Sequence, residues 1–384
     1  MRTLIKWIGR LLLLLGIAAI FVGVWKREEI NRLLAVNSLF EQDKIVQNFS
    51  NMDAAFLNVD VPRGDGPVSP LLTGEPFDLP PSVADWIVER DVTSLLIMKD
   101  GQIRHEAYFL DTAAEDRRIS WSVAKSYLSA LVGILLEEGT IASIDDPVTK
   151  YAPELVDSAY DGATLRNVLN MASGVTFNED YLDFNSDINR MGRVLALGGR
   201  MDDFAASLTE TFINPGLQWQ YVSIDTHVIS MVIRGATGRS IADLLSGKVI
   251  QPLGLEQSPY YLTDGVGTAF VLGGLNLTTR DYARFGQMFA QGGNWQGEQI
   301  VPADWVEQST KPTAPGYADY GFQWWMPENA ASGEYFARGV YGQYIYINAP
   351  EQVVIVTTGA DRQFREAGVS EQNEAIFRLI VENL

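Results

Sequence analysis

The sequence predicts an α/β protein in which an antiparallel sheet is flanked by helices and carries a large helical insertion. Segments typical of strands occur at residues 93–109 and again after residue 335, whereas about 145–270 has a mostly helical pattern. An amphipathic helix closes the chain. Strands at both ends of a domain with helices between them predict one sheet covered by helices, because a sheet must bury its apolar face.

The N-terminal residues predict a signal anchor. Three positive charges in "MRTLIKWIGR" precede an uncharged run from Leu11 to Trp25, which is the layout of a secretory signal or a membrane anchor. We expect residues 1–27 to form a transmembrane segment that places a catalytic domain on the periplasmic side of a bacterial inner membrane. Secretion after signal cleavage is the alternative, although no small-x-small cleavage site follows the run.

The next segment, residues 28–75, is predicted as a juxtamembrane stretch and a loop, since "GDGPVSPLLTGEPFDLPPS" is rich in Pro and Gly. The main domain is expected at 76–384, with the helical insertion as its subdomain. It begins with a hairpin, because the apolar runs of "TSLLIMKDGQIRHEAYF" flank Asp100-Gly101. A long helix follows in "ISWSVAKSYLSALVGILLEEGT", where Gly139 is placed to end it.

The C-terminal part returns to strands before the last helix. The segments "YGQYIYI" and "QVVIVTT" are rich in β-branched and aromatic residues, and they flank a turn at Ala349-Pro350. The amphipathic pattern of "EQNEAIFRLIVENL" then predicts the closing helix.

The composition indicates a globular protein and excludes several functions. A chain of 384 residues with 47% hydrophobic and 20% charged residues can bury a substantial core. Its net charge of -19 disfavours nucleic acid as a partner, because phosphate binding needs clustered Lys and Arg. The lack of cysteine excludes disulfides, thiol catalysis and thiolate metal sites. We expect no metal and no cofactor, and the oligomeric state is not predicted.

The pair Ser122 and Lys125 is the first candidate for chemistry. On a helix, residues three apart share a face, so the Lys125 amine can reach the Ser122 hydroxyl. A lysine desolvated there has a lowered pKa and can act as the base that a weakly nucleophilic hydroxyl requires. The alternative is a helix-capping serine followed by a solvated lysine, and this stretch alone does not decide between them.

Other catalytic patterns are weak. No G-x-S-x-G motif occurs, which argues against an ordinary α/β-hydrolase, and no P-loop occurs. The chain has two histidines, His105 on the predicted hairpin and His227 in a helical run, without an H-E-x-x-H zinc motif. A triad of Ser122 with His227 is conceivable, although His227 also fits a structural polar residue.

Further motifs follow Ser-x-x-Lys in order. Tyr221-Val222-Ser223 lies in "PGLQWQYVSIDTHV", and a strand bearing glycine lies in "FARGVYGQYIYINAPEQVVIVTTGAD". This order resembles the penicillin-recognising serine hydrolases, which include class C β-lactamases, D-alanyl-D-alanine carboxypeptidases, esterases and amidases. The resemblance runs from about residue 90 to the C terminus and implies a β-lactamase/transpeptidase-like fold. Tyr-x-Ser and Gly-x-x-Gly-Gln, at Gly339 to Gln343, are most similar to the 6-aminohexanoate-dimer (nylon oligomer) hydrolase branch.

The resemblance implies roles for these residues. Ser122 would be the nucleophile, Lys125 and Tyr221 would transfer its proton, and Ser223 would orient both groups. The backbone N–H groups of Ser122 and Val340 would form the oxyanion hole, supported by Gly339. The alternative for Tyr221 is an ordinary core tyrosine.

The resemblance also implies substrate contacts. Tyr181 in "NEDYLDF" is a candidate gate, or else an ordinary surface-loop aromatic, and Tyr341 and Gln343 are further candidate contacts with substrate. Two tryptophans, Trp324 and Trp325, would line the acyl pocket or belong to the core.

The third motif departs from that of β-lactamases and carboxypeptidases, which place Lys or His before Thr-Gly. Here the stretch is Ala337-Arg338-Gly339, and strand alternation would direct Arg338 to the other face. Small neutral esters or amides, hydrolysed through an acyl-enzyme, therefore fit better than β-lactams. The alternative is a catalytically weak or inactive peptidoglycan- or β-lactam-binding protein of the same fold.

Overall fold

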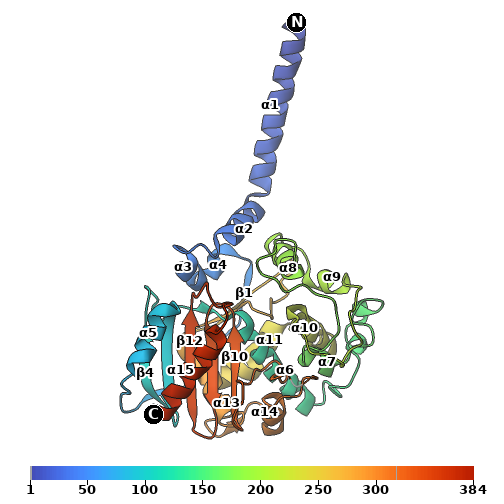
Figure 1. Ribbon diagram of the computed structural model, residues 1–384. Helices are drawn as coiled ribbons and strands as arrows, with labels where there is room; N and C mark the ends of the chain where they lie inside the picture. Colours follow the sequence, from blue (N-terminus) through green and yellow to red (C-terminus); the bar gives the residue numbers. More distant parts are fainter. Residues whose placement is uncertain (1, 317) are drawn as a thin grey trace.

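The computed structural model describes residues 2–316 and 318–384 and is built on a six-stranded sheet. Its strand order is β10-β11-β12-β3-β4-β2, and all neighbours are antiparallel except β2 and β4 (Figure 1). The strand bounds are Leu72–Thr73 (β2), Val92–Lys99 (β3), Gln102–Tyr108 (β4), Glu334–Gly339 (β10), Gln343–Asn348 (β11) and Val353–Gly359 (β12). Strands from both ends of the chain share this sheet, which confirms the predicted α/β architecture.

The predicted hairpins are confirmed. Strands β3 and β4 are joined at Asp100 and Gly101, which have φ angles of 52° and 75°. Two consecutive positive φ angles match the right-handed twist of paired strands, and an Asp-Gly sequence suits them. Strands β11 and β12 pair on either side of the predicted turn at Ala349-Pro350.

Helices cover both faces of the sheet. Helices α5 (Pro81–Glu89) and α15 (Val369–Asn383) share a buried apolar cluster with side chains of one face, such as Phe336 and Tyr346. Helix α13 (Thr279–Ala290) packs against β3, β11 and β12, and its Phe285 belongs to the larger core of the molecule. The sheet is therefore the middle layer between helices.

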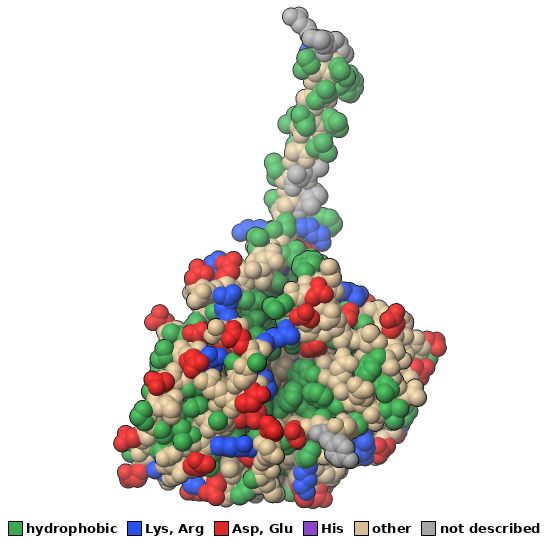
Figure 2. All heavy atoms as spheres, viewed as in Figure 1, with side chains coloured by type: hydrophobic (Ala, Val, Ile, Leu, Met, Phe, Trp, Pro, Cys, Tyr) green, Lys and Arg blue, Asp and Glu red, His purple; other side chains and the backbone are tan. Residues whose placement is uncertain are grey.

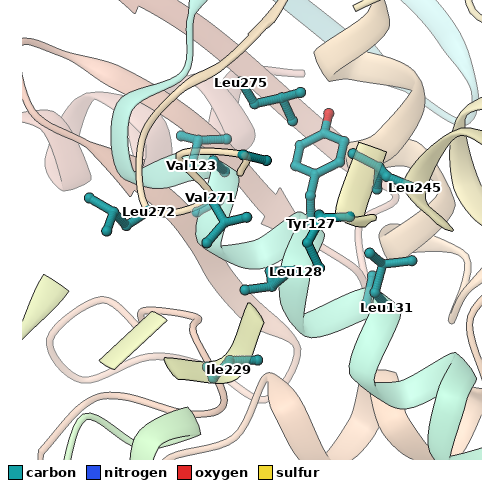
Figure 3. Packing of buried hydrophobic residues seen from close by; sticks show 14 of the residues in the cluster. Val123, Tyr127, Leu128, Leu131, Ile229, Leu245, Val271, Leu272 and Leu275 are labelled. Atoms are coloured by element: carbon teal, nitrogen blue, oxygen red, sulfur yellow. The ribbon is translucent and has the colours of Figure 1, made fainter. Parts of the chain in front are cut away.

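The helix that carries Ser-x-x-Lys runs through the larger core. It begins as a 3₁₀ turn, Trp121–Val123, and continues as α6 (Ala124–Glu137), with Gly139 at φ 70° just beyond it as predicted. Side chains of this segment pack against residues of α10, α11 and the segment 271–275 (Figure 3). Its position is consequently fixed on several sides.

The region predicted as helical contains most of the remaining helices. They are α7 (Leu165–Leu169), α8 (Asp187–Ala196), α9 (Met201–Ala206), α10 (Ser223–Thr237), α11 (Ile241–Leu245) and α12 (Gln251–Leu253), and α14 (Ala303–Ser309) follows later. A second sheet of order β1-β6-β7-β5 lies beside them, and the sequence analysis did not anticipate it. Its strands are Asn58–Asp60 (β1), Arg118–Ile119 (β5), Tyr260–Leu262 (β6) and Leu275–Leu277 (β7), and a short hairpin joins Asn294–Trp295 (β8) to Glu298–Gln299 (β9).

At the N terminus, α1 (Arg2–Trp25) extends away from the rest of the molecule, and α2 (Arg27–Ser38) connects it to the domain (Figure 1). Across residues 2–316 and 318–384, no helix is both long and apolar enough to cross a membrane. The predicted transmembrane helix is therefore not supported, since Lys6 and Arg10 shorten the uncharged run.

The segment predicted as juxtamembrane packs into the domain. Two short helices, α3 (Ile45–Ser50) and α4 (Met52–Ala55), follow α2. Side chains from this stretch, including Phe49 and Val61, belong to the same buried core as α6 and α13. Much of the chain between residues 39 and 61 therefore contributes side chains to the hydrophobic core of the domain.

Candidate active site

Ser122 and Lys125 meet as the sequence predicts. Lys125 Nζ lies 2.9 Å from Ser122 Oγ and 2.7 Å from the carbonyl oxygen of Leu272. Ser122 lies in the first turn of the helical segment and is half-buried, whereas Lys125 is only 1% exposed. The solvated lysine of the alternative interpretation is excluded, because this amine is enclosed by the core.

Burial sets the charge of this lysine. Removal from water disfavours the ammonium form, which lowers the pKa of Lys125 from its usual 10.5 to about 7, while the negative charge of Glu179 acts in the opposite direction. A substantial fraction of the amine is therefore neutral near pH 7. A neutral amine within hydrogen-bonding distance of a hydroxyl can accept its proton.

Tyr221 completes the predicted trio. The Lys125 amine lies 5.4 Å from the centroid of the Tyr221 ring, which stacks on Trp325 at 5.3 Å. Burial raises the pKa of Tyr221 above its usual value, while hydrogen bonding with Ser122 lowers it. The phenol therefore stays protonated near neutral pH, which suits a group that gives a proton to a leaving group.

Glu179 is a site residue that the sequence analysis missed. Its carboxylate accepts hydrogen bonds from the Ser223 hydroxyl, from the Ser223 N–H at 3.1 Å and from the Tyr181 hydroxyl at 2.9 Å. It also acts on the Lys125 amine through its charge. The residue lies in the quoted segment "NEDYLDF", but no local pattern indicates that this loop meets the start of α10.

Glu179 has a measurable consequence for pH dependence. We expect kcat/KM to rise with pH around a midpoint near 7, because Lys125 must lose its proton to act as a base. In Glu179→Gln the midpoint should shift to lower pH, since loss of the negative charge removes an influence that raises the pKa of Lys125. Rates of p-nitrophenyl ester hydrolysis across pH would measure both midpoints. Glu307→Gln, a surface control, should leave the midpoint unchanged, and an unchanged or higher midpoint in Glu179→Gln would contradict the assignment.

The end of β10 passes close to the Ser122 backbone. Gly339 is the last residue of this strand, and a Cβ there would lie 2.5 Å from Ser120 O and 3.1 Å from Ser122 N. Only glycine permits this approach. It brings Val340, which follows Gly339, beside Ser122, as the predicted oxyanion hole requires.

Replacing this glycine tests that approach. Gly339→Ala should lower kcat for ester hydrolysis by about 10²-fold, because β10 must move away from Ser122 and misplace one oxyanion donor. Steady-state kinetics and thermal unfolding would check this result. Gly66→Ala is a matched control, since nothing lies within 4 Å of its added Cβ. Wild-type kcat in Gly339→Ala would show that the close approach has no role in catalysis.

A pocket of about 290 Å³ opens beside Ser122. Its lining includes Tyr181, Tyr221, Trp325 and Phe364, together with Gly339 and Val340 from the end of β10. Figure 2 shows that this face of the molecule is hollowed and that hydrophobic side chains form the floor of the hollow. The lining therefore combines aromatic side chains with the charged side chains of Arg338, Arg365 and Glu366.

The two tryptophans have different settings. Trp325 lines this pocket, whereas Trp324 is fully buried against Phe285, Phe289 and Tyr335 and belongs to the core. Tyr181 also lines the pocket and is half-buried, so it is not an ordinary surface aromatic. Its role as a gate stays a prediction.

Two predicted substrate contacts lie outside the lining of this pocket. Gln343 is buried, and its side-chain amide donates to Val340 O, Tyr341 O and Gly359 O at 3.0 to 3.2 Å. Tyr341 packs among aromatic side chains on the far side of the same turn. Both residues shape the turn that carries Val340 instead of facing the cavity, because β10 and β11 meet there.

The expectation for Arg338 is wrong in one respect. Alternation does direct its side chain toward Tyr344, its register partner, whose ring centroid lies 6.0 Å from the guanidinium. However, β10 is an edge strand, so the long side chain reaches round it and lines the pocket, 5.6 Å from the Trp325 ring centroid. Its Nη2 donates to Ser370 Oγ at 2.7 Å. The pocket lining therefore includes this cation together with Arg365 and Glu366.

The conceivable Ser122–His227 triad does not form. His227 Nε2 lies 2.7 Å from Asp202 Oδ1, and Arg234 donates to the same carboxylate. His227 is fully buried on α10 and serves as a structural polar residue.

Comparison with known proteins identifies the family. The family model described as Beta-lactamase matches residues 87–373. The chain belongs to the beta-lactamase family. It is also similar to the 6-aminohexanoate-dimer hydrolase of Paenarthrobacter ureafaciens, with 30% identity over 293 residues that cover 72% of this chain and 74% of that protein. The resemblance inferred from the ordered motifs is confirmed.

Solved structures agree on the fold of this beta-lactamase family member. A Bacillus anthracis protein, provisionally described as a 6-aminohexanoate-dimer hydrolase, has a TM-score of 0.77 at 22% identity, covering 90% of this chain and 95% of that one. A D-stereospecific amidohydrolase from Streptomyces has a TM-score of 0.54 at 17% identity, covering 75% and 98%. Family membership and the hydrolase relatives make this protein a serine hydrolase.

Proposed function

We propose that the protein hydrolyses small esters or short amides through an acyl-enzyme intermediate on Ser122. The observation that carries this proposal is the 2.9 Å separation of Lys125 Nζ and Ser122 Oγ, in a setting that lowers the pKa of the lysine to about 7. A base with a pKa near the working pH is the most effective activator of a hydroxyl.

The reaction proceeds in two steps. Ser122 Oγ attacks the carbonyl carbon while Lys125 accepts the hydroxyl proton, and Tyr221 gives a proton to the departing alcohol or amine. The Lys125 ammonium then returns a proton to the Tyr221 phenolate, so both groups regain their starting states. Water attacks the acyl-enzyme ester and gives a proton to Lys125, which passes it to the departing Ser122 oxygen, and the carboxylic acid product leaves. The N–H groups of Ser122 and Val340 stabilise the oxyanion in both steps, while Ser223, held by Glu179, orients Tyr221.

The size and lining of the pocket support a small acyl group. A volume of about 290 Å³ suits a short acyl chain, which the aromatic side chains can contact, while Arg338, Arg365 and Glu366 on the same lining can meet a polar group of the substrate. The relative from Paenarthrobacter ureafaciens is described as a 6-aminohexanoate-dimer hydrolase. Short linear amides of that kind are therefore candidate substrates beside simple esters.

A substrate panel with an active-site probe tests the proposal. Purified protein would be assayed with p-nitrophenyl esters of increasing acyl length, 6-aminohexanoate dimer and nitrocefin. In parallel, a fluorophosphonate would label the protein, and peptide mass spectrometry would locate the adduct. We expect turnover of short esters or the dimer and a single adduct on Ser122.

Other outcomes would replace this proposal. Stable binding of β-lactams or peptidoglycan fragments without turnover of any ester or amide would favour a weak or inactive binding protein of the same fold. An adduct on another serine would refute the assignment of the nucleophile.

The location of the protein is a separate proposal that rests on the basic residues and apolar run at the N terminus. We propose that the catalytic domain is exported to the periplasm, with secretion after signal cleavage as the alternative. Fractionation of bacteria, with N-terminal sequencing of the mature chain, would separate the two, and recovery with cytosolic markers would contradict both.

A further inference from the structure

Two aromatic residues beside the proposed oxyanion hole have an unusual backbone conformation. Trp121 precedes Ser122 with φ 44°, and Tyr341 follows Val340 with φ 63°. Bulky L-residues seldom adopt positive φ, and they keep it only where the surrounding structure holds them. The two proposed donor residues therefore each adjoin a strained position.

The side chains that hold these positions come from the N-terminal segment. Phe40, just after α2, stacks on Tyr341 with ring centroids 5.0 Å apart and an interplanar angle of 12°. Phe49 of α3 meets both strained residues edge-on, at 5.4 Å from Trp121 and 5.4 Å from Tyr341. Phe49 thus contacts both residues that flank the proposed oxyanion donors.

A buried arginine fixes this segment to the backbone that leads to Ser122. Arg118 of β5 is fully buried and donates hydrogen bonds to Val46 O and to Ser50 Oγ, the latter at 2.9 Å. Its guanidinium also lies 5.7 Å from the Phe49 ring centroid. Helix α3 is therefore tied to the chain shortly before the nucleophile.

The aromatic cluster of Phe40, Phe49, Trp121 and Tyr341 is connected to the substrate pocket through Phe364. Tyr341 packs against Phe364 at 4.6 Å, and Phe364 lines the pocket beside Ser122. Phe40 and Phe49 themselves lie outside residues 87–373, the part of the chain that matches the family model. The contacts of Phe40 and Phe49 with Trp121 and Tyr341 therefore join the N-terminal segment to the part of the chain that matches the family model.

We propose that Phe40 and Phe49 are positioning residues of this hydrolase. They clamp Trp121 and Tyr341 so that the N–H groups of Ser122 and Val340 converge on one oxyanion. This inference rests on the proposed function, because it assigns the clamp to the same acyl-transfer site. It makes the segment between α2 and α4 part of the catalytic apparatus.

Conservative variants separate positioning from general packing. In Phe40→Ala and Phe49→Leu we expect kcat for p-nitrophenyl acetate to fall on the order of tenfold or more, with little change in KM, because a displaced donor weakens transition-state binding. Phe40 is 36% exposed, so Phe40→Ala should unfold at nearly the wild-type temperature. Phe40→Tyr keeps the stacked ring and should retain wild-type kcat.

Matched controls complete the experiment. Phe377→Leu makes the same change in a fully buried phenylalanine on the opposite side of the sheet, and Phe212→Ala removes another exposed phenylalanine. Both should keep wild-type kcat at temperatures where they are folded. An active wild type with unchanged kcat in Phe40→Ala and Phe49→Leu would overturn this inference alone. A wild type that neither turns over esters or amides nor reacts at Ser122 would overturn the proposed function and this inference with it.

Discussion

Replacing Ser122 with alanine is expected to lower kcat by at least about 10⁴-fold, because no other group can form the acyl-enzyme. The remaining activity would come from the oxyanion donors and the pocket, which still bind the substrate. Fluorophosphonate labelling should disappear completely. The measurement is steady-state hydrolysis of the best substrate of the panel, together with labelling followed by mass spectrometry.

The control for this variant lies on the same helix. Ser129 is fully buried on α6, and its hydroxyl has no hydrogen-bond partner among the described residues. Ser129→Ala should therefore leave both turnover and labelling unchanged. If Ser122→Ala retained more than a small fraction of wild-type turnover, the acyl-enzyme mechanism would have to be abandoned.

Replacing Lys125 with methionine is expected to lower kcat by about 10³-fold, within the range typical for loss of a general base. Methionine fills a similar volume without an amine, so Ser122 loses its proton acceptor. Burying an amine costs free energy because the amine loses its hydration. Removing the amine therefore compensates, in the free energy of unfolding, for the lost hydrogen bond to Leu272 O. The melting temperature should therefore stay close to that of the wild type, which excludes unfolding as the cause.

The pH profile and a surface control sharpen this test. The rise of activity around pH 7 should vanish in Lys125→Met, because the group that titrates there is gone. Lys150 forms an exposed ion pair with Asp146, and Lys150→Met should have wild-type kinetics. Retained activity in Lys125→Met, with the same pH profile, would refute the role of Lys125 as base.

Local sequence patterns were sufficient for much of the fold and for the centre of the site. Asp100-Gly101 predicts its hairpin because both residues tolerate positive φ, and the order of strands and helices predicts one covered sheet. Helical spacing places Ser122 and Lys125 within reach of each other, and the order of the later motifs favours a catalytic pair; the observed separation of 2.9 Å agrees with this interpretation.

Other features of the site depend on contacts between distant segments. Glu179 reaches Ser223 across the fold, and the contact of Phe49 with Tyr341 joins opposite ends of the chain. Arg338 obeys strand alternation, yet it enters the pocket because β10 is the edge of the sheet. Periodicity reports only which face a residue occupies, not what lies opposite that face.

The sequence by itself determined which groups can react: a hydroxyl and an amine one helical turn apart, followed by a tyrosine motif and a glycine-bearing strand. The tertiary structure alone decided their chemical state. Lys125 is a base near neutral pH because segments remote in the sequence bury it, while the carboxylate of Glu179 limits the fall of its pKa. Burial and charge are properties of the assembled fold, and so no local pattern contains them.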